Sequence, residues 1–395
     1  MAQCTGIIAE YNPFHNGHKY HIEMTKKLNG NRPIIVAMSG WFVQRGDVAI
    51  FDPYVRTKWA LENGADMVLM LPTIFSMSHA ERFASGGVSL LESTGMVDSL
   101  SFGAECEDVS LISRLAETIN SESGEYKSAL TNALNSGKSF PTARSEALCR
   151  ILGPESAALL SSPNNILGIE YLNAIKKIKS DIKPMAIKRI GAEHDSLGSK
   201  NGLMSASAIR GKIRQKNNSE ILQTIPDGVF SDISSLTMLD IEKLSQSVIY
   251  ALRRLSVEEI ASLPDVSEGL ENTIYAACRN SSDFNELTSS IKSKRYTLAR
   301  IRRICLNVLL GITKQDYVHH AKPEFIRVLG VRRDSLPLLS ELTQKASLPI
   351  VTCRADYDKL NPSAKVAFNK DIFASEAAQI NSSVISDFKR KLIIV

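Results

Sequence analysis

Short apolar runs alternate with helical patterns along roughly the first 220 residues, and this alternation most limits the folds open to the chain. The runs CTGIIAE, PIIVAMS, DMVLML and VDSLSFG are typical of buried parallel strands. Helical patterns lie between them near 17–29, 53–64 and 79–96; residues 107–180 look mostly helical, and KPMAIKRIG is expected to form a further strand. Repeated βαβ units of this kind predict an α/β fold with a doubly wound parallel sheet.

The pattern changes near residues 218–228, after which apolar residues recur at helical spacing behind Ser and Asp start signals. A chain of 395 residues is long enough for two domains. We therefore expect a doubly wound α/β domain over 1–222 and a mainly α-helical domain over 223–395, with a short mixed tail that contains SLPIVT.

Composition narrows the class of protein. Hydrophobic content is 44% and charged content 23%, values that are typical of a globular protein. No run of eighteen apolar residues predicts a membrane helix, and the start of the chain lacks the regions of a signal peptide. Six scattered cysteines without a CxxC motif argue against structural zinc and against a disulfide scaffold. We expect a cytoplasmic protein without a membrane partner.

The stretch EYNPFHNGHKYH, residues 10–21, lies where the first strand meets the first helix, which is where doubly wound sheets bind ligands. Gly17 allows close approach of the backbone, and the free amides of a helix that begins there suit phosphate. His15 and His18 can then donate hydrogen bonds to phosphate oxygens. The alternatives are an incidental surface pair and a metal site, but HExxH spacing and nearby acidic or cysteine partners are absent. We predict no metal ligands here and a structural role for His21.

A second element, MSASAIRGKI, covers residues 204–213. Ser205 or Ser207 can cap the following helix and offer a hydroxyl to phosphate, and Arg210 can fork onto phosphate oxygens. Taken alone, the element is equally typical of an ordinary capped helix. NSGKSF does not qualify as a P-loop, because Asn132 stands where the motif needs glycine.

The word H-N-G-H resembles the H-x-G-H signature of the nucleotidyltransferase superfamily, and SASAIR resembles its I-S-S-T-x-I-R element. The lysine of the synthetase version is missing, which argues against aminoacylation. The ordered segments GIIAEYNPFHNGHKYHI, MSGWFVQRGDVAIFDPYVRTKWALENGADMVLMLP, FGAE, PNNILGIEYLNA, SASAIR, SKRYTLARIRRICLNVLLGITKQD and FIRVLGV resemble the bacterial tRNA(Met) cytidine acetate ligase family over nearly the full length.

The resemblance implies an enzyme that activates acetate with ATP as acetyl-adenylate and acetylates N4 of the wobble cytidine of elongator tRNA(Met). Residues 1–222 would activate acetate and 223–395 would bind tRNA, with ATP as cosubstrate together with Mg²⁺. By position, the resemblance implies an ATP site made of Ile7, Ile8, Ala9, Glu10, Tyr11, Asn12, Pro13, Phe14, His15, Asn16, Gly17, His18, Lys19, Tyr20, Gly103, Asn164 and Arg189. Taken locally, Asn164 is equally typical of a helix cap and Arg189 of a surface charge.

Acetate is already an anion at neutral pH, so its activation needs a neutralised α-phosphate and no general base. His15, His18, Ser207 and Arg210 are the predicted catalytic residues because they can supply that neutralisation. Gln44 and Arg45 are candidates to meet either the acetate carboxylate or the tRNA. The sequence does not decide between these two roles, and it does not indicate an oligomeric state.

Positive charge is concentrated in residues 286–334, which hold eleven Lys/Arg and four Asp/Glu; the difference, 11 − 4, is +7 in a chain whose total is +5. Such a cluster suits RNA phosphates, and an interleaved tyrosine can stack on a base. The predicted tRNA-binding residues are Lys292, Lys294, Arg295, Tyr296, Arg300, Arg302 and Arg303. The alternative is a solvated helix face with Tyr296 in the core.

Two other functions stay open at this point. A small-molecule nucleotidyltransferase of the H-x-G-H type accounts for the histidines but leaves the basic helical half without a role. A non-catalytic RNA-binding protein accounts for the basic half but not for the phosphate-binding motif.

Overall fold

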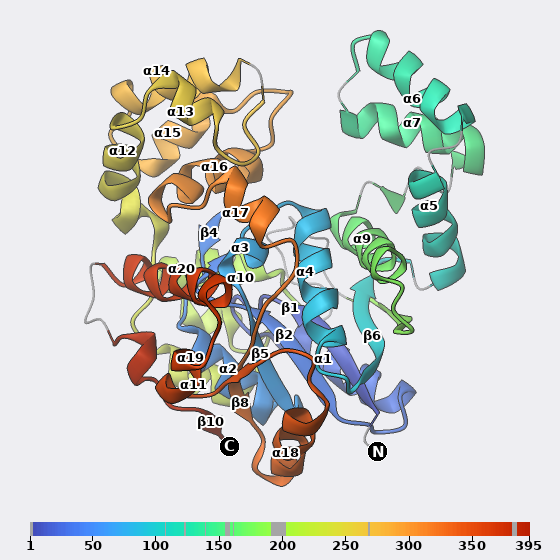
Figure 1. Cartoon of the computed structure of the whole chain (residues 1–395), viewed down its shortest axis with the longest axis vertical. Coiled ribbons are helices and arrows are strands. Elements are labelled where there is room, and N and C mark those ends of the chain that lie inside the picture. The colour runs from blue at the N-terminus through green and yellow to red at the C-terminus, as the bar shows by residue number, and fades with distance from the viewer. Residues whose placement is uncertain are drawn as a thin grey trace.

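The computed structural model describes residues 3–106, 108–121, 124–138, 140–154, 159–160, 162–190, 203–267, 269–380 and 385–395. Within these residues, no helix combines the length and the apolar character needed to cross a membrane. A central sheet carries helices on both faces, and two helical groups extend from the same end of it (Figure 1).

The central sheet has eight strands in the order β10-β8-β5-β2-β1-β6-β7, with β9 paired to β8. Its strands are β1 (Cys4–Ala9), β2 (Ile34–Ser39), β5 (Met67–Leu71), β6 (Val97–Ala104), β7 (Lys183–Lys188), β8 (Ile326–Val331), β9 (Ile350–Val351) and β10 (Ile393–Ile394). The five strands from β5 to β7 in this order are mutually parallel, as the sequence predicted. Every residue of β2 and β5 is buried, because helices cover both faces of the sheet.

The chain winds outward from β1 in both directions, which makes the sheet doubly wound. Helix α1 (Asn16–Leu28) leads from β1 to β2, α2 (Pro53–Glu62) leads to β5, and α4 (Ala80–Glu92) returns the chain to β6 on the other side of β1. Right-handed crossovers in opposite directions place α4 on the face opposite α1 and α2. The topological switch point therefore lies between the carboxyl ends of β1 and β6, where such sheets bind ligands.

Short elements and a helical arm complete the first half. A two-stranded hairpin, β3 (Phe42–Val43) and β4 (Asp47–Val48), and α3 (Thr73–Ser76) lie beside the main sheet. The helices α5 (Val109–Ser121), α6 (Gly124–Asn135), α7 (Phe140–Leu152) and α9 (Pro163–Ile178) follow β6; α9 packs against α4 and α5. The helices α6 and α7 form the group at the upper right of Figure 1. Helix α10 (Ala206–Arg214) and η1 (Asn218–Ile221) end this half.

The second helical group, at the upper left of Figure 1, runs from residue 245 to residue 319. It contains α12 (Ser245–Arg253), α13 (Val257–Ala261), α14 (Leu270–Asn280), α15 (Phe284–Ile291), α16 (Leu298–Leu309) and α17 (Lys314–His319). The segments α11 (Asp227–Ile233) and η2 (Ile241–Leu244) lead into it. We refer to residues 245–319 as the helical unit.

The chain then returns to the sheet, which the sequence did not predict. The elements after the helical unit are β8, η3 (Arg333–Ser335), α18 (Leu336–Lys345), β9, α19 (Arg354–Asp358), α20 (Pro362–Ala378), η4 (Asp387–Lys389) and β10. Strand β8 pairs antiparallel with β5, and β10 pairs with β8. The division at residues 222/223 stays a proposal, and the central sheet runs across it.

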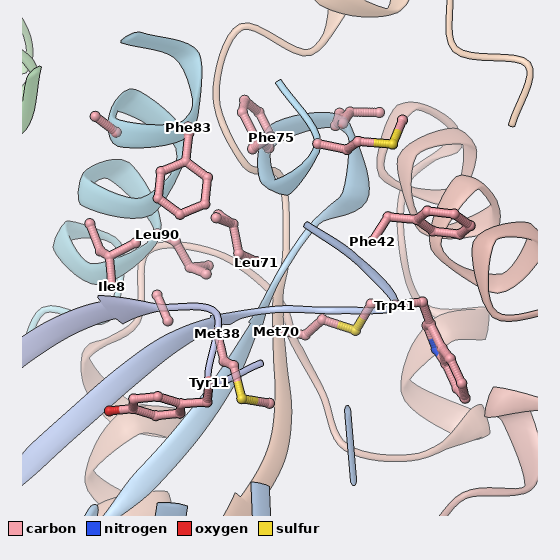
Figure 2. Packing of buried hydrophobic residues seen from close by; sticks show 14 of the residues in the cluster. Ile8, Tyr11, Met38, Trp41, Phe42, Met70, Leu71, Phe75, Phe83 and Leu90 are labelled. Atoms are coloured by element: carbon pink, nitrogen blue, oxygen red, sulfur yellow. The ribbon is translucent and has the colours of Figure 1, made fainter. Parts of the chain in front are cut away.

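One part of the hydrophobic core lies between the sheet and α4 (Figure 2). Figure 2 shows Ile8 of β1, Leu71 of β5 and the α4 residues Phe83 and Leu90 packed together, and all four are buried. Phe83 and Ile8 also line the cavity described next. The floor of that cavity is thus part of the main hydrophobic core, which holds it in place.

Candidate active site

A cavity of about 390 Å³ opens at the carboxyl ends of β1, β6 and β7. Helices α1, α4, α9 and α10 begin around it, and each brings its first turn to the cavity wall. The cavity therefore occupies the switch point that the topology defines.

Most of the predicted site residues lie in the wall of this cavity. They are Ile7, Ile8, Ala9, Glu10, His15, Gly17, His18, Tyr20, Gly103, Asn164, Arg189, Ser207 and Arg210. Gln44 and Arg45 are also in the wall. Tyr11, Asn12, Pro13, Phe14, Asn16 and Lys19 do not line the cavity, and the first four of them are buried beneath the motif.

The two motif histidines are held by the backbone of their own turn. His15 is the N-cap of α1, and its Nδ1 accepts a hydrogen bond from the Gly17 amide at 3.0 Å. The His15 amide donates to Nδ1 of His18 at 3.3 Å. The two rings stack with centroids 3.7 Å apart. A Cβ on residue 17 would lie 2.9 Å from the His15 ring, so glycine is what lets that ring fold over the helix start.

These hydrogen bonds fix the tautomer of both rings. A backbone amide can only donate, so Nδ1 of each histidine carries no proton and the ring proton sits on Nε2. Burial, with Arg189 and Arg210 nearby, lowers the pKa of His15 to about 3, and burial lowers the pKa of His18 well below its usual value. Both residues are neutral hydrogen-bond donors at physiological pH. They can stabilise phosphate charge without carrying a formal charge of their own.

The loop before α1 is held in place by hydrogen bonds from other segments of the chain. Tyr11 has a left-handed backbone with φ 48°, and the Asn12–Pro13 peptide is cis. The Asn12 side-chain oxygen accepts from the Ile50 amide at 2.9 Å. Nη1 of Arg210 donates to the Asn12 carbonyl at 2.8 Å, which joins the second motif directly to the first.

The second motif opens α10 as the sequence predicted. Ser205 is the N-cap, and its hydroxyl accepts from the Ala208 amide at 3.3 Å. The Ser205 and Ser207 hydroxyls lie 3.1 Å apart at the cavity wall. Burial lowers the pKa of Arg210, which remains a cation beside the phosphate-binding turn of α1.

Arg189, at the end of β7, has a carboxylate partner. Its Nε lies 3.4 Å from Oε1 of Glu105, and the side-chain Nδ2 of Asn164 donates to the same oxygen at 2.7 Å. A Cβ on residue 103 would lie 3.3 Å from Cγ of Arg189, so Gly103 leaves room for the arginine to cross the strand end. Asn164 therefore acts in a side-chain network and not as a helix cap.

One buried cation, Arg56 of α2, supports the site from below and was not predicted. It is fully buried and donates to the carbonyls of Phe51, Glu10, Ser39 and Gly40. Burial lowers its pKa to about 10, so it stays charged. Four carbonyl acceptors, three of them at the ends of β1 and β2 and one just before α2, compensate for its desolvation. The sequence showed only an arginine on a helix and gave no sign of these nonlocal partners.

The cavity wall contains both charged and apolar side chains. Among the described residues of its wall, the cations are Arg45, Lys188, Arg189 and Arg210, and the only carboxylate is Glu10. The apolar and aromatic residues of the wall include Phe83, Phe102, Ile166, Leu167, Tyr171, Leu203 and Met204. The sequence did not indicate these apolar residues as part of the site, because apolar residues in such patterns are equally typical of core positions. A polyanion attached to a flat heterocycle fits a wall that offers both cations and apolar surface.

The predicted tRNA-binding residues fall into two groups. Lys292, Lys294 and Arg295 are exposed on the helical unit. The others contact protein: Tyr296 is buried, Arg300 donates to the Asp265 carbonyl, and Arg302 and Arg303 donate to the carbonyls of Gly46 and Gln44. Of the predicted residues, only the first group is exposed at the surface, where side-chain cations can bind phosphate.

A doubly wound sheet with paired histidines at the switch point and a serine–arginine element beside them defines a nucleotidyltransferase of the H-x-G-H class. The model of the HIGH Nucleotidyl Transferase family matches residues 2–391. Relatives named tRNA(Met) cytidine acetate ligase are similar to this chain along its length. The protein from Thermoanaerobacter sp. strain X514 is 41% identical over 98% of each chain. The protein from Caldanaerobacter subterraneus is 39% identical over 95% of this chain and 94% of the relative.

Two solved structures of TmcAL from Thermotoga maritima are also similar. One, bound with alpha-thio ATP, has a TM-score of 0.92 at 30% identity and covers 99% of each chain. The other, an apo form, has a TM-score of 0.93 at 31% identity and covers all of both chains. The chain belongs to the HIGH nucleotidyltransferases and, among them, to the tRNA(Met) cytidine acetate ligase family, which confirms the resemblance drawn from the sequence.

Proposed function

We propose that the protein activates acetate with ATP and transfers the acetyl group to N4 of the wobble cytidine of elongator tRNA(Met), in the cytoplasm. The observation that carries the proposal is the cavity at the switch point, where two neutral imidazoles and two arginines converge. The named relatives and the ATP-analogue complex of the Thermotoga protein support the choice of substrates.

The cavity suggests how ATP lies. We place the triphosphate at the first turn of α1, where free amides and the imidazole Nε2–H groups are available. Arg189 and Arg210 flank that position. The adenine then lies near the neighbouring rings of Phe102 and Tyr171, where stacking and burial stabilise a flat ring.

In the first step, an acetate oxygen bonds to the α-phosphorus and the bond from that phosphorus to the bridging oxygen breaks. Pyrophosphate leaves with the electron pair, and acetyl-adenylate remains. Negative charge builds up on the α-phosphate oxygens and on the leaving group, so donors aimed at these oxygens lower the barrier. We assign that role to His15, His18, Ser207 and Arg210.

In the second step, the N4 amine of cytidine attacks the acetyl carbonyl, the amine loses a proton and AMP leaves. This amine is conjugated with its ring and is a weak nucleophile, so an anhydride donor is needed.

Gln44 and Arg45 lie in the wall of the same cavity, and we place the acetate carboxylate beside them. The exposed Lys292, Lys294 and Arg295 would bind tRNA phosphates.

Mg²⁺ fits as an ion that is held chiefly by the triphosphate. No group of three His, Cys, Asp or Glu among the described residues can hold a metal ion. Glu10 is the carboxylate that the described wall offers to such an ion. Mg²⁺ would supply charge neutralisation on the phosphates.

Mass spectrometry of elongator tRNA(Met) after incubation with pure protein, ATP and labelled acetate tests the proposal. We expect one labelled acetyl group on the wobble cytidine, dependent on ATP. A tRNA without label, in a preparation that still binds ATP, contradicts the proposal. Turnover of a phosphorylated metabolite without RNA would instead support the small-molecule nucleotidyltransferase.

A further inference from the structure

Residues 44–47, the turn that joins β3 to β4 together with the first residue of β4, lie between the cavity and the helical unit. Gln44 and Arg45 form part of the cavity wall. On the other side of the turn, Nε of Arg302 donates to the Gly46 carbonyl at 2.9 Å, and Nη1 of Arg303 donates to the Gln44 carbonyl at 3.0 Å. Both arginines belong to α16 of the helical unit.

The contact between this turn and α16 is a close backbone contact. Gly46 has φ +71°, and a Cβ at this position would lie 2.7 Å from the backbone nitrogen of Arg303. Nη2 of Arg302 also lies 3.5 Å from Oδ1 of Asp47. The turn is thus held by backbone packing, two hydrogen bonds and an ion pair, all from consecutive residues of one helix.

The same turn contacts both halves of the nucleotide site. The Gln44 amide donates to the Glu10 carboxylate at 3.0 Å, directly after β1. Asp47 lies 3.9 Å from Nη2 of Arg214, which is on α10 together with Ser207 and Arg210. A displacement of residues 44–47 would therefore disturb two contacts: the one with Glu10 beside the H-N-G-H turn and the one with Arg214 on α10.

The burial of these arginines is hard to reconcile with binding to RNA. Arg303 is 8% exposed, and its Nε lies 3.6 Å from the Asp265 carboxylate. Arg302 is partly buried with its guanidinium between Gly46 and Asp47. A phosphate would have to displace these protein partners, which would leave part-buried carbonyls without donors.

We propose that Arg302 and Arg303 are positioning residues for the activation of acetate, and that they act by holding residues 44–47 against the cavity. This inference rests on the proposed function, because it concerns the place of acetate beside Gln44 and Arg45. It assigns to the helical unit a part in the first chemical step, before any tRNA is present.

The test is acetate-dependent exchange of pyrophosphate into ATP, measured without tRNA on the full-length protein. Arg302→Met removes the hydrogen bond and the ion pair made by α16, and Gly46→Ala disturbs the contact from the turn, because the added Cβ would overlap the backbone of Arg303. We expect both variants to raise the KM for acetate by about tenfold or more and to change the KM for ATP by less than about twofold, because misplacement of a reactant by an ångström costs large factors. Arg302→Lys, which retains a cation beside Asp47, should recover part of the loss.

Arg253→Met is the matched control. Arg253 also donates to backbone carbonyls, those of Cys278, Arg279 and Ser281, but these lie inside the helical unit. This variant should leave the KM for acetate at the wild-type value. Thermal melting of all variants shows whether folding is retained.

Three results overturn the inference. The first is normal exchange by Arg302→Met and Gly46→Ala, with a raised KM for tRNA only. The second is an equal rise in the KM for ATP and for acetate, which indicates general damage. The third is the same defect in Arg253→Met. If the wild-type protein shows no acetate-dependent exchange, the proposed function itself fails, and that outcome is distinct from these three.

Discussion

The H-N-G-H turn and the basic helix α16 both carry clustered nitrogen-rich side chains, but their side chains have different partners. In the turn, His15 and His18 use one ring nitrogen on the backbone and keep the other as a donor. In α16, Arg302 and Arg303 direct their guanidinium groups to carbonyls of the neighbouring half. The comparison shows that a short motif on one turn defines its own geometry, whereas a cluster of charge does not define what it contacts.

Removal of an imidazole donor should give the largest effect. His15→Asn keeps an N-cap acceptor for the Gly17 amide but loses the Nε2–H donor. We expect acetate-dependent pyrophosphate exchange to fall about 100- to 1000-fold, the usual loss when a transition-state donor is removed. The affinity for tRNA, measured by filter binding, should stay at the wild-type value.

His15→Ala is the paired variant for this prediction. It removes the cap as well as the donor, so it should show the same loss of exchange and a lower Tm, with a cost of about 1 kcal/mol for the cap. If His15→Asn retained full exchange, the assignment of His15 to phosphate would be wrong and only its capping role would stand.

Loss of the exposed charges should give the next largest effect. The triple substitution of Lys292, Lys294 and Arg295 by alanine removes the solvated cations of the basic segment. We expect the Kd for tRNA to rise about tenfold or more and the slope of log Kd against log salt to flatten by about two units. Titration of labelled tRNA at several salt concentrations measures both. An unchanged salt slope would place the RNA surface elsewhere.

The buried histidines should make stability depend on pH. The folded protein lowers the pKa of His15 from 6.5 to about 3 and that of His21 to about 4, so the folded state favours neutral rings. The contribution of these neutral imidazoles to the free energy of unfolding is complete above pH 6.5, and it is lost as the pH falls from 6.5 toward 3. For each imidazole, the free energy of unfolding should fall by up to about 1.4 kcal/mol for every pH unit that the pH is lowered in that window.

Urea unfolding at pH 7, 6 and 5 measures this loss. Wild type should lose stability more steeply than His15→Asn, which lacks one of the imidazoles. Equal slopes in the two proteins would mean that His15 is not desolvated in the folded state.

The smallest effect is expected at Tyr296. This residue is buried, its ring lies 5.1 Å from the Arg300 guanidinium carbon, and its hydroxyl accepts from Ser267 at 3.1 Å. Tyr296→Phe should cost about 1 kcal/mol of stability for the lost hydrogen bond and leave the Kd for tRNA unchanged. A clear loss of tRNA binding would show that the tyrosine meets RNA after all.

The parallel part of the fold could be predicted from the sequence because its signals are local. The strands β1, β2, β5, β6 and β7 are continuous apolar runs, and the helices between them have clear spacing. Strand β8 was missed because FIRVLGV contains a buried arginine. Arg327 is buried because it pairs with Asp387 at 3.0 Å and with the Tyr54 hydroxyl at 2.8 Å. Both partners lie far away in the chain, so no local pattern reveals them.

The candidate site could likewise be predicted from the sequence where its signals are local, and not where they are nonlocal. Residues of the H-N-G-H turn, Ser207 and Arg210 reach the cavity because they lie at helix starts that the sequence marks. The partners that set their chemistry are nonlocal: Glu105 for Arg189, and four carbonyls for Arg56. The protonation state of His15 depends on burial by the whole fold, which spacing alone does not give.

The return of the chain to the sheet has a consequence for biosynthesis. Strand β8 covers the edge of β5, and β8 follows the whole helical unit in the chain. During translation the sheet around the nucleotide site keeps an unpaired edge until residues 326–331 have left the ribosome. The parallel strands of a nascent chain therefore keep this edge unpaired until the helical unit has been made, and the sheet is not completed without that unit attached.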